Sequence, residues 1–281
     1  MKKSINYWAC PGGGDGSKSI SEFLHEAKAA GFEAVELCCG ESGELSLDST
    51  EAAVRAIADQ ARETGIDIAS VASGLLWKYS LTSADASVRE RAIGIVRKGL
   101  EVAAWARTDA LLVVPGVVAS GLASEAVQYD LAYERSLAAM KDLAPLAEEL
   151  KVHIAIENVW NGFLLSPMEM AEFVDRTGSD YVGVYFDVGN VLNTGRPEHW
   201  IRILGDRIRR IHVKDFKVSV GNLGGFVDLL SGDVNWPEVM NALREIGYDG
   251  PLTAEVFPYK YHPEVLIKNT SAAMDAIMGR T

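Results

Sequence analysis

Hydrophobic residues along this chain form short continuous runs, and longer segments of helical periodicity separate them. Runs such as 110–114 and 182–186 consist almost entirely of aliphatic and aromatic residues. Continuous runs of this length are typical of strands that are buried on both faces. The intervening segments, such as 50–63 and 85–106, place apolar residues three and four positions apart, which predicts amphipathic helices. The pattern therefore predicts strands and helices in alternation.

The alternation predicts an α/β fold of eight strand–helix units. Strands are expected at 5–9, 34–37, 66–72 and 110–114, and then in four runs that end at Glu157, Asp187, His212 and Glu255. Helices are expected at 19–30, 50–63, 85–106, 129–149, from 166, at 198–204, from 237 and at 263–278. Eight such units form a (β/α)8 TIM barrel, and we expect residues 1–281 to be one barrel domain.

A doubly wound open sheet is the alternative fold. Such a sheet usually has fewer strands, and a glycine-rich phosphate turn with G-x-G-x-x-G spacing follows its first strand. The segment 11–16, PGGGDG, is rich in glycine but lacks this spacing. The barrel is therefore the preferred prediction.

The overall charge limits the class of partner. The chain has 39 acidic and 27 basic residues, a formal net charge of −12. Binding to nucleic acid or to an anionic membrane requires clustered Lys and Arg, so neither partner is expected. The start of the chain does not resemble a signal peptide, and no apolar run is long enough to span a membrane. We expect a cytoplasmic protein that acts on a small molecule.

The three cysteines, Cys10, Cys38 and Cys39, cannot all pair with one another, and two of them are adjacent. We interpret them as reduced thiols near the ends of the first two strands. Small, buried and unreactive side chains are the expected role of these residues.

Four consecutive predicted strands end in a residue that can bind a metal ion. These residues are Glu157, Asp187, His212 and Glu255. Parallel strands that are joined by helices have all their C-terminal ends at one rim of the barrel, where the chemistry of this fold takes place. Three carboxylates and one imidazole suit a divalent cation such as Mn²⁺, Mg²⁺ or Co²⁺. The sequence therefore predicts a metal site at this rim.

The segments around these four residues resemble a known superfamily. The segments are 156–158 (IEN), 186–190 (FDVGN), 211–215 (IHVKD) and 254–255 (AE). They resemble the xylose-isomerase-like TIM-barrel sugar isomerases and epimerases, and most closely the branch of D-tagatose 3-epimerase and of L-ribulose- and L-xylulose-5-phosphate 3-epimerase. The resemblance implies that Glu157, Asp187, His212 and Glu255 hold one divalent ion. Mn²⁺ is the expected ion, with Mg²⁺, Co²⁺ or Zn²⁺ as alternatives.

The resemblance also implies an activity. It implies epimerisation at C3 of a ketose or ketose phosphate through a metal-stabilised enediolate, with Glu157 and Glu255 as the acid–base pair. An aldose–ketose isomerase and a keto-sugar or inosose lyase or dehydratase are the alternatives for the same site. Two positions depart from the epimerases of unphosphorylated ketoses, since Asn190 replaces a histidine and Phe163 replaces an acidic residue. Family members are often dimers or tetramers, so a homo-oligomer is expected.

Further rim residues are candidates for substrate contact. Lys214 and Lys217 are expected to contact hydroxyls or a phosphate, and Asp215 to orient His212 from behind. The remaining candidates for substrate contact are Asn190, Trp8 and Glu36. For Glu36 a structural hydrogen bond is the preferred interpretation. The segment 216–234 is long for a loop after a strand and contains four glycines. Such a loop is either a lid or binding loop or a mobile surface segment.

Overall fold

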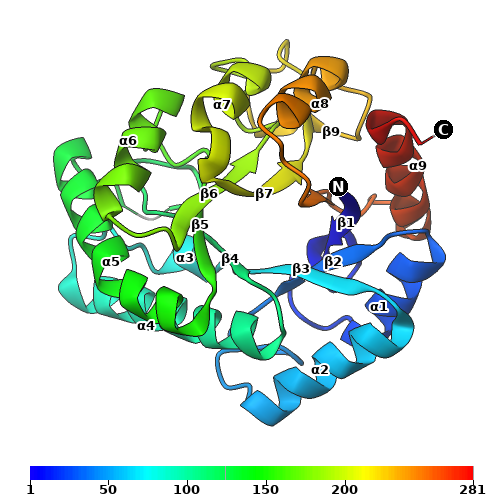
Figure 1. Ribbon diagram of the computed structural model, residues 1–281, viewed down its shortest axis with the longest axis horizontal. Helices are drawn as coiled ribbons and strands as arrows, with labels where there is room; N and C mark the ends of the chain where they lie inside the picture. The colour runs from blue at the N-terminus through cyan, green and yellow to red at the C-terminus, as the bar shows by residue number, and fades with distance from the viewer. Residues whose placement is uncertain (124, 281) are drawn as a thin grey trace.

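The chain folds into a closed barrel of parallel strands surrounded by helices (Figure 1). The structure is a computed structural model that describes residues 1–123 and 125–280. The strand order around the barrel is β1-β10-β7-β6-β5-β4-β3-β2. These strands are β1 (Lys2–Asn6), β2 (Ala34–Cys38), β3 (Asp67–Ala72), β4 (Ala110–Val113), β5 (His153–Glu157), β6 (Val182–Asp187), β7 (Ile208–Val213) and β10 (Pro251–Ala254). The predicted (β/α)8 TIM barrel is confirmed.

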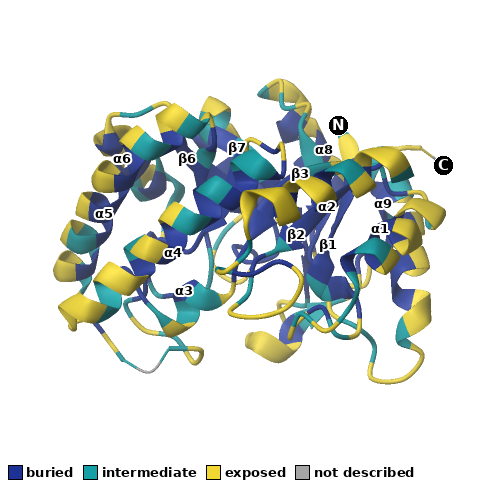
Figure 2. Cartoon of the chain, turned by 90° about the horizontal axis from the view of Figure 1, so that it is seen from below, coloured by how far each residue is buried: buried dark blue, intermediate teal, exposed yellow. Residues whose placement is uncertain are grey.

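Helices cover the outside of the barrel, and the longer ones turn a buried face inward (Figure 2), whereas the short helix α3 packs against α4. They are α1 (Ile20–Ala29), α2 (Glu51–Thr64), α3 (Leu75–Lys78), α4 (Ala86–Trp105), α5 (Tyr129–Leu150), α6 (Pro167–Thr177), α7 (Pro197–Leu204), α8 (Trp236–Glu245) and α9 (Leu266–Met278). Within the described ranges, none of these helices combines the length and the apolarity that crossing a bilayer requires.

Local sequence signals fix several helix ends. The side chain of Ser19 accepts a hydrogen bond from the backbone N–H of Glu22 at the start of α1, and Thr50 caps α2 in the same way. Ser166 caps α6, and Pro167 occupies its first position, where no intrahelical N–H bond is lost. Gly65 ends α2 with φ of 72°, a left-handed conformation that glycine adopts without steric cost.

Several strand boundaries differ from the prediction by one to three residues, and the first strand begins at Lys2 rather than at residue 5. The first strand ends at Asn6 rather than at residue 9, because the side chain of Asn6 accepts a hydrogen bond from the N–H of Trp8 and starts the 3-10 helix η1 (Tyr7–Ala9). The last strand ends at Ala254. Glu255 follows it directly, and its N–H still donates to the carbonyl of Val213 at 3.1 Å. This bond keeps the Glu255 backbone against β7.

The long segment after β7 is folded rather than extended. It contains a two-stranded antiparallel sheet of β8 (Asp215–Phe216) and β9 (Phe226–Val227), with the 3-10 helix η3 (Leu223–Gly225) between the strands. Gly232 packs so closely on Asp215 that a Cβ atom at residue 232 would lie 2.0 Å from Asp215 Oδ1. The glycine therefore permits the close approach of residue 232 to the Asp215 carboxylate and to the backbone nitrogen of Phe216.

Candidate metal centre

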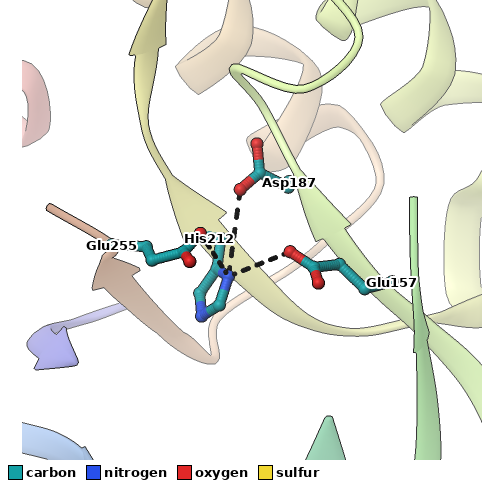
Figure 3. A group of neighbouring side chains, drawn as sticks. All are labelled: Glu157, Asp187, His212 and Glu255. Carbon is teal, nitrogen blue, oxygen red and sulfur yellow. Dashed lines mark hydrogen bonds and ion pairs between the residues drawn. The ribbon is translucent and has the colours of Figure 1, made fainter. Parts of the chain in front are cut away.

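The four predicted ligands converge at one end of the barrel (Figure 3). Each of Glu157, Asp187, His212 and Glu255 offers one ligand atom, and these atoms all lie within 4.8 Å of one another. All four residues are buried. The four side chains at these strand ends therefore lie together, as the sequence predicts.

Strand register explains how these side chains meet. Asp187 on β6 pairs with His212 on β7, and His212 pairs in turn with Thr253 on β10. Because side chains alternate between the two faces of a strand, Glu255 points to the same side as Thr253, which is the inside of the barrel. Glu157 pairs with Tyr185, two residues before Asp187. Glu157 and Asp187 therefore enter the cluster from adjacent strands.

The distances around His212 match those of a small coordination shell. Its Nδ1 atom lies 3.4 Å from Glu157 Oε1, 3.4 Å from Glu255 Oε2 and 3.8 Å from Asp187 Oδ2. Ligand atoms that each lie about 2.1 Å from a tetrahedral ion are separated by about 3.4 Å. The spacing of the ligand atoms therefore fits one ion.

The charges and the hydrogen bonds also fit a cation. Asp187 Oδ2 and Glu255 Oε2 are buried and accept no hydrogen bond from any group in residues 1–123 and 125–280. Lys214 Nζ lies 3.3 Å from Asp187 Oδ2 and forms an ion pair with Glu255 Oε2. One ammonium does not balance three buried carboxylates, and buried charges require compensation. Three carboxylates and one imidazole are a donor set for a divalent cation.

The two glutamates occupy different electrostatic environments. Burial and repulsion from Glu255 and Asp187 raise the pKa of Glu157 to about 7, although a hydrogen bond with His212 opposes the shift. Burial would also raise the pKa of Glu255, but Lys214 and His212 outweigh it and hold that pKa well below its usual value. The pKa values of the two glutamates therefore differ because Lys214 contacts Glu255 and lowers the pKa of that carboxyl group.

Asp215 has different partners from the one expected, and Glu36 makes a structural hydrogen bond, which was one of its two expected roles. The carboxylate of Asp215 accepts bonds from the backbone N–H groups of Leu230 and Val234 and from Trp236 Nε1, so it holds the loop 216–234. The expectation that Asp215 orients His212 is corrected. Glu36 contacts His212 instead: its Oε1 atom lies 2.9 Å from His212 Nε2. Burial alone would raise the pKa of Glu36, but His212 and Ser70 outweigh it, and the pKa is lowered.

Asn158 and Asn190 fix the backbone around Asp187. Asn158 Oδ1 accepts from the Asp187 N–H at 2.9 Å, and Asn158 Nδ2 donates to the Asp187 carbonyl at 2.8 Å. The N–H of Asn190 donates to Asp187 Oδ1 at 2.7 Å, and its side-chain amide donates to the carbonyl of Asn158 at 3.0 Å. The sequence reasoning gave Asn158 no role. Its position directly after Glu157, at the end of a strand, was the available signal.

The other predicted substrate contacts are at different distances from the cluster. Lys214 lies within it, with its ammonium 4.9 Å from the centre of the Phe226 ring. Lys217 lies on the loop, half-exposed, and pairs with Asp233 at 3.4 Å. Trp8 is partly buried and packs against the small apolar cluster inside the barrel. The structure therefore places Lys214 beside the ligands and Lys217 outside them.

Phe163 lies in an apolar cluster. Its ring is buried and packs edge-on against Tyr129, with ring centres 5.7 Å apart, and against Phe173 at 5.9 Å. Edge-to-face packing of this kind stabilises aromatic pairs beyond the area that they bury. At this position the side chain contributes to packing.

A family model described as "Xylose isomerase-like TIM barrel" matches residues 24–277. A D-psicose 3-epimerase of Enterocloster bolteae is 30% identical over 128 residues, which are 44% of this chain and 40% of that protein. An uncharacterized protein of Methanocaldococcus jannaschii is 26% identical over 167 residues, 57% of this chain and 55% of that protein. The matches thus span about half of these relatives' lengths.

The fold also resembles solved structures along its full length. A D-psicose 3-epimerase from Clostridium cellulolyticum H10, solved with D-tagatose, matches with a TM-score of 0.81 and 17% identity. The match covers 99% of each chain. At this identity the likeness is one of fold.

Proposed function

This chain belongs to the xylose isomerase-like TIM barrel family, and on that premise we propose that it is a sugar epimerase. The proposed reaction is inversion at C3 of a ketose or ketose phosphate, with one divalent ion held by Glu157, Asp187, His212 and Glu255. Mn²⁺ is the proposed ion, because carboxylate ligands with one imidazole suit it. Mg²⁺, Co²⁺ and Zn²⁺ are the alternatives.

One observation carries this proposal: two glutamates flank the centre. Glu157 and Glu255 lie on opposite sides of His212, each with an oxygen 3.4 Å from its Nδ1 atom (Figure 3). They come from β5 and from the end of β10, with β6 and β7 between them in the barrel. A sugar bound between them would have one carboxyl group on each face.

Inversion requires two proton-transfer groups. One carboxylate removes the proton from C3, and a carboxylic acid on the opposite face returns a proton to the same carbon. When bound, a divalent cation supplies Lewis acidity that stabilises the negative charge of the enediolate. We assign the proton transfers to Glu157 and Glu255, and the remaining ligand positions to Asp187 and His212.

Other residues complete the proposed site. Lys214 and Asn190 lie next to the ligands and are proposed to contact sugar hydroxyls. Trp8 is proposed as an apolar wall, and Lys217 as a contact for the far end of the substrate. A cytoplasmic location and a dimeric or tetrameric assembly are further parts of this proposal.

The test is a reaction in D₂O. The Mn²⁺-loaded protein is incubated with a panel of ketoses and ketose phosphates, and the products are analysed by NMR. The expected product is the C3 epimer with deuterium at C3. An aldose with deuterium at C1 or C2 would show an isomerase, and a dehydrated or cleaved product would show a lyase or dehydratase. If the loaded protein turns over no member of the panel, the proposed function is wrong.

A further inference from the structure

We propose that Glu36 is a positioning residue of the metal centre, which fixes the ring of His212 with its Nδ1 atom facing the other ligands. The inference rests on the proposed function only in so far as that function needs this centre. It assigns a role to a side chain on the far side of His212 from the proposed substrate.

The position of Glu36 places it behind the histidine ring. Glu36 lies on β2, and β1 and β10 separate β2 from β7, which carries His212. The carboxylate is fully buried and reaches His212 Nε2 at 2.9 Å. The opposite nitrogen, Nδ1, faces Glu157 and Glu255 at 3.4 Å each. Glu36 thus contacts the nitrogen that points away from the cluster.

This contact selects one tautomer of the ring. A carboxylate has no hydrogen to donate, so the hydrogen in the bond to Glu36 must be on Nε2. In a neutral imidazole, Nδ1 then carries the lone pair that can bind a cation. The hydrogen bond also fixes the plane of the ring. Partners of this kind behind a metal-binding histidine typically change metal affinity by about 10–100-fold.

Glu36 is itself held in place by the interior of the barrel. Ser70 Oγ donates to its Oε2 at 2.7 Å, and the side-chain amide of Asn6 donates to its Oε1. The hydroxyl of Tyr185 lies 3.1 Å from Ser70 Oγ, and the Tyr185 ring lies 4.3 Å from the His212 ring. A carboxylate with these donors has one orientation, which it transmits to the histidine.

The test measures Mn²⁺ affinity by calorimetry in wild type, Glu36→Leu and Glu36→Gln. Leucine removes the acceptor, and we expect the affinity to fall by about 10–100-fold. Glutamine can still accept the bond from Nε2, so a smaller loss is expected. The control is Thr253→Val, because Thr253 lies beside His212 in register and its buried hydroxyl has no hydrogen-bond partner among the described residues. The Mn²⁺ affinity of Thr253→Val should equal that of wild type.

A second measurement separates positioning from general stabilisation. The Nε2–H proton of His212 should give a downfield NMR signal in wild type and lose it in Glu36→Leu. If both Glu36 variants bind Mn²⁺ like wild type and the signal persists, the proposal is overturned. If wild type binds no Mn²⁺, the proposed function fails. The Nε2–H signal of His212 in wild type and in Glu36→Leu still decides whether Glu36 fixes the ring of His212.

A third variant covers the case in which Glu36→Leu does not fold. Ser70→Ala keeps Glu36 but removes one of the donors that hold it. We expect Ser70→Ala and Glu36→Gln to fold, as shown by circular dichroism, and to bind Mn²⁺ more weakly than wild type. Wild-type affinity in both would overturn the proposal.

Discussion

The ammonium of Lys214 lies 3.3 Å from Oδ2 of Asp187, inside the cluster of the four candidate metal ligands. Lys214 is two residues after His212 on the same segment, and its side chain is 10% exposed. The ammonium therefore offsets part of the negative charge of the three buried carboxylates. This relationship has a measurable consequence for stability.

We predict that Lys214→Met destabilises the fold when metal is chelated. Loss of the ammonium removes the positive charge that faces Asp187 and Glu255, and breaking a buried ion pair typically costs about 3–5 kcal/mol. Added Mn²⁺ should reduce the difference from wild type, because a bound cation supplies the missing positive charge. Urea denaturation with EDTA and with Mn²⁺ measures both effects.

Lys217→Met is the matched control for this variant. Lys217 pairs with Asp233 in a half-exposed position, and such pairs contribute less than about 1 kcal/mol. Equal stability of Lys214→Met and wild type in EDTA would contradict the role of Lys214 in charge compensation.

Glu157→Gln and Glu255→Gln should each lose most of the activity. Glutamine preserves the volume and one oxygen but cannot exchange a proton, and loss of a general acid or base typically lowers kcat by about 10²–10⁴-fold. Steady-state kinetics on the best substrate of the panel measures the loss. Glu172→Gln, on the exposed face of α6, is the control and should keep wild-type kcat. A variant with full turnover would remove that glutamate from the acid–base pair.

The cysteines should be unreactive in the native protein. Burial raises the pKa of Cys10 and of Cys39 to about 12 each, and burial together with Glu36 and Glu255 raises that of Cys38. A raised pKa keeps a thiol protonated, so at pH 8 only about one in 10,000 of the Cys10 and Cys39 groups is the reactive thiolate. Titration with a thiol reagent should therefore be slow at pH 7–9. In guanidinium chloride all three cysteines should react quickly.

Asp215→Ala should release the loop 216–234 without weakening the metal centre. The variant leaves the N–H groups of Leu230 and Val234 and the indole of Trp236 without their acceptor, a loss of roughly 2–4 kcal/mol. Hydrogen exchange should rise in this segment, while Mn²⁺ affinity stays at the wild-type value. A large drop in affinity without increased exchange would restore the expected link between Asp215 and His212.

The sequence by itself was sufficient to predict the barrel and the meeting of four candidate metal ligands. Apolar runs and capping signals are local, so strands and helices can be predicted before any tertiary contact is known. In a barrel of parallel strands, all C-terminal ends share one rim, so Glu157, Asp187, His212 and Glu255 could be brought together from strand ends alone. Local capping by Asn6 was the signal that the prediction of the first strand missed.

Only the tertiary structure decided which side chains support these ligands. Glu36 and His212 are 176 residues apart, and their hydrogen bond depends on barrel closure and on the register of the strands between them. Lys214 and Asp215 are adjacent, yet one enters the cluster and the other holds the loop. Successive side chains along an extended backbone point to opposite sides, and what each side meets depends on how distant segments pack.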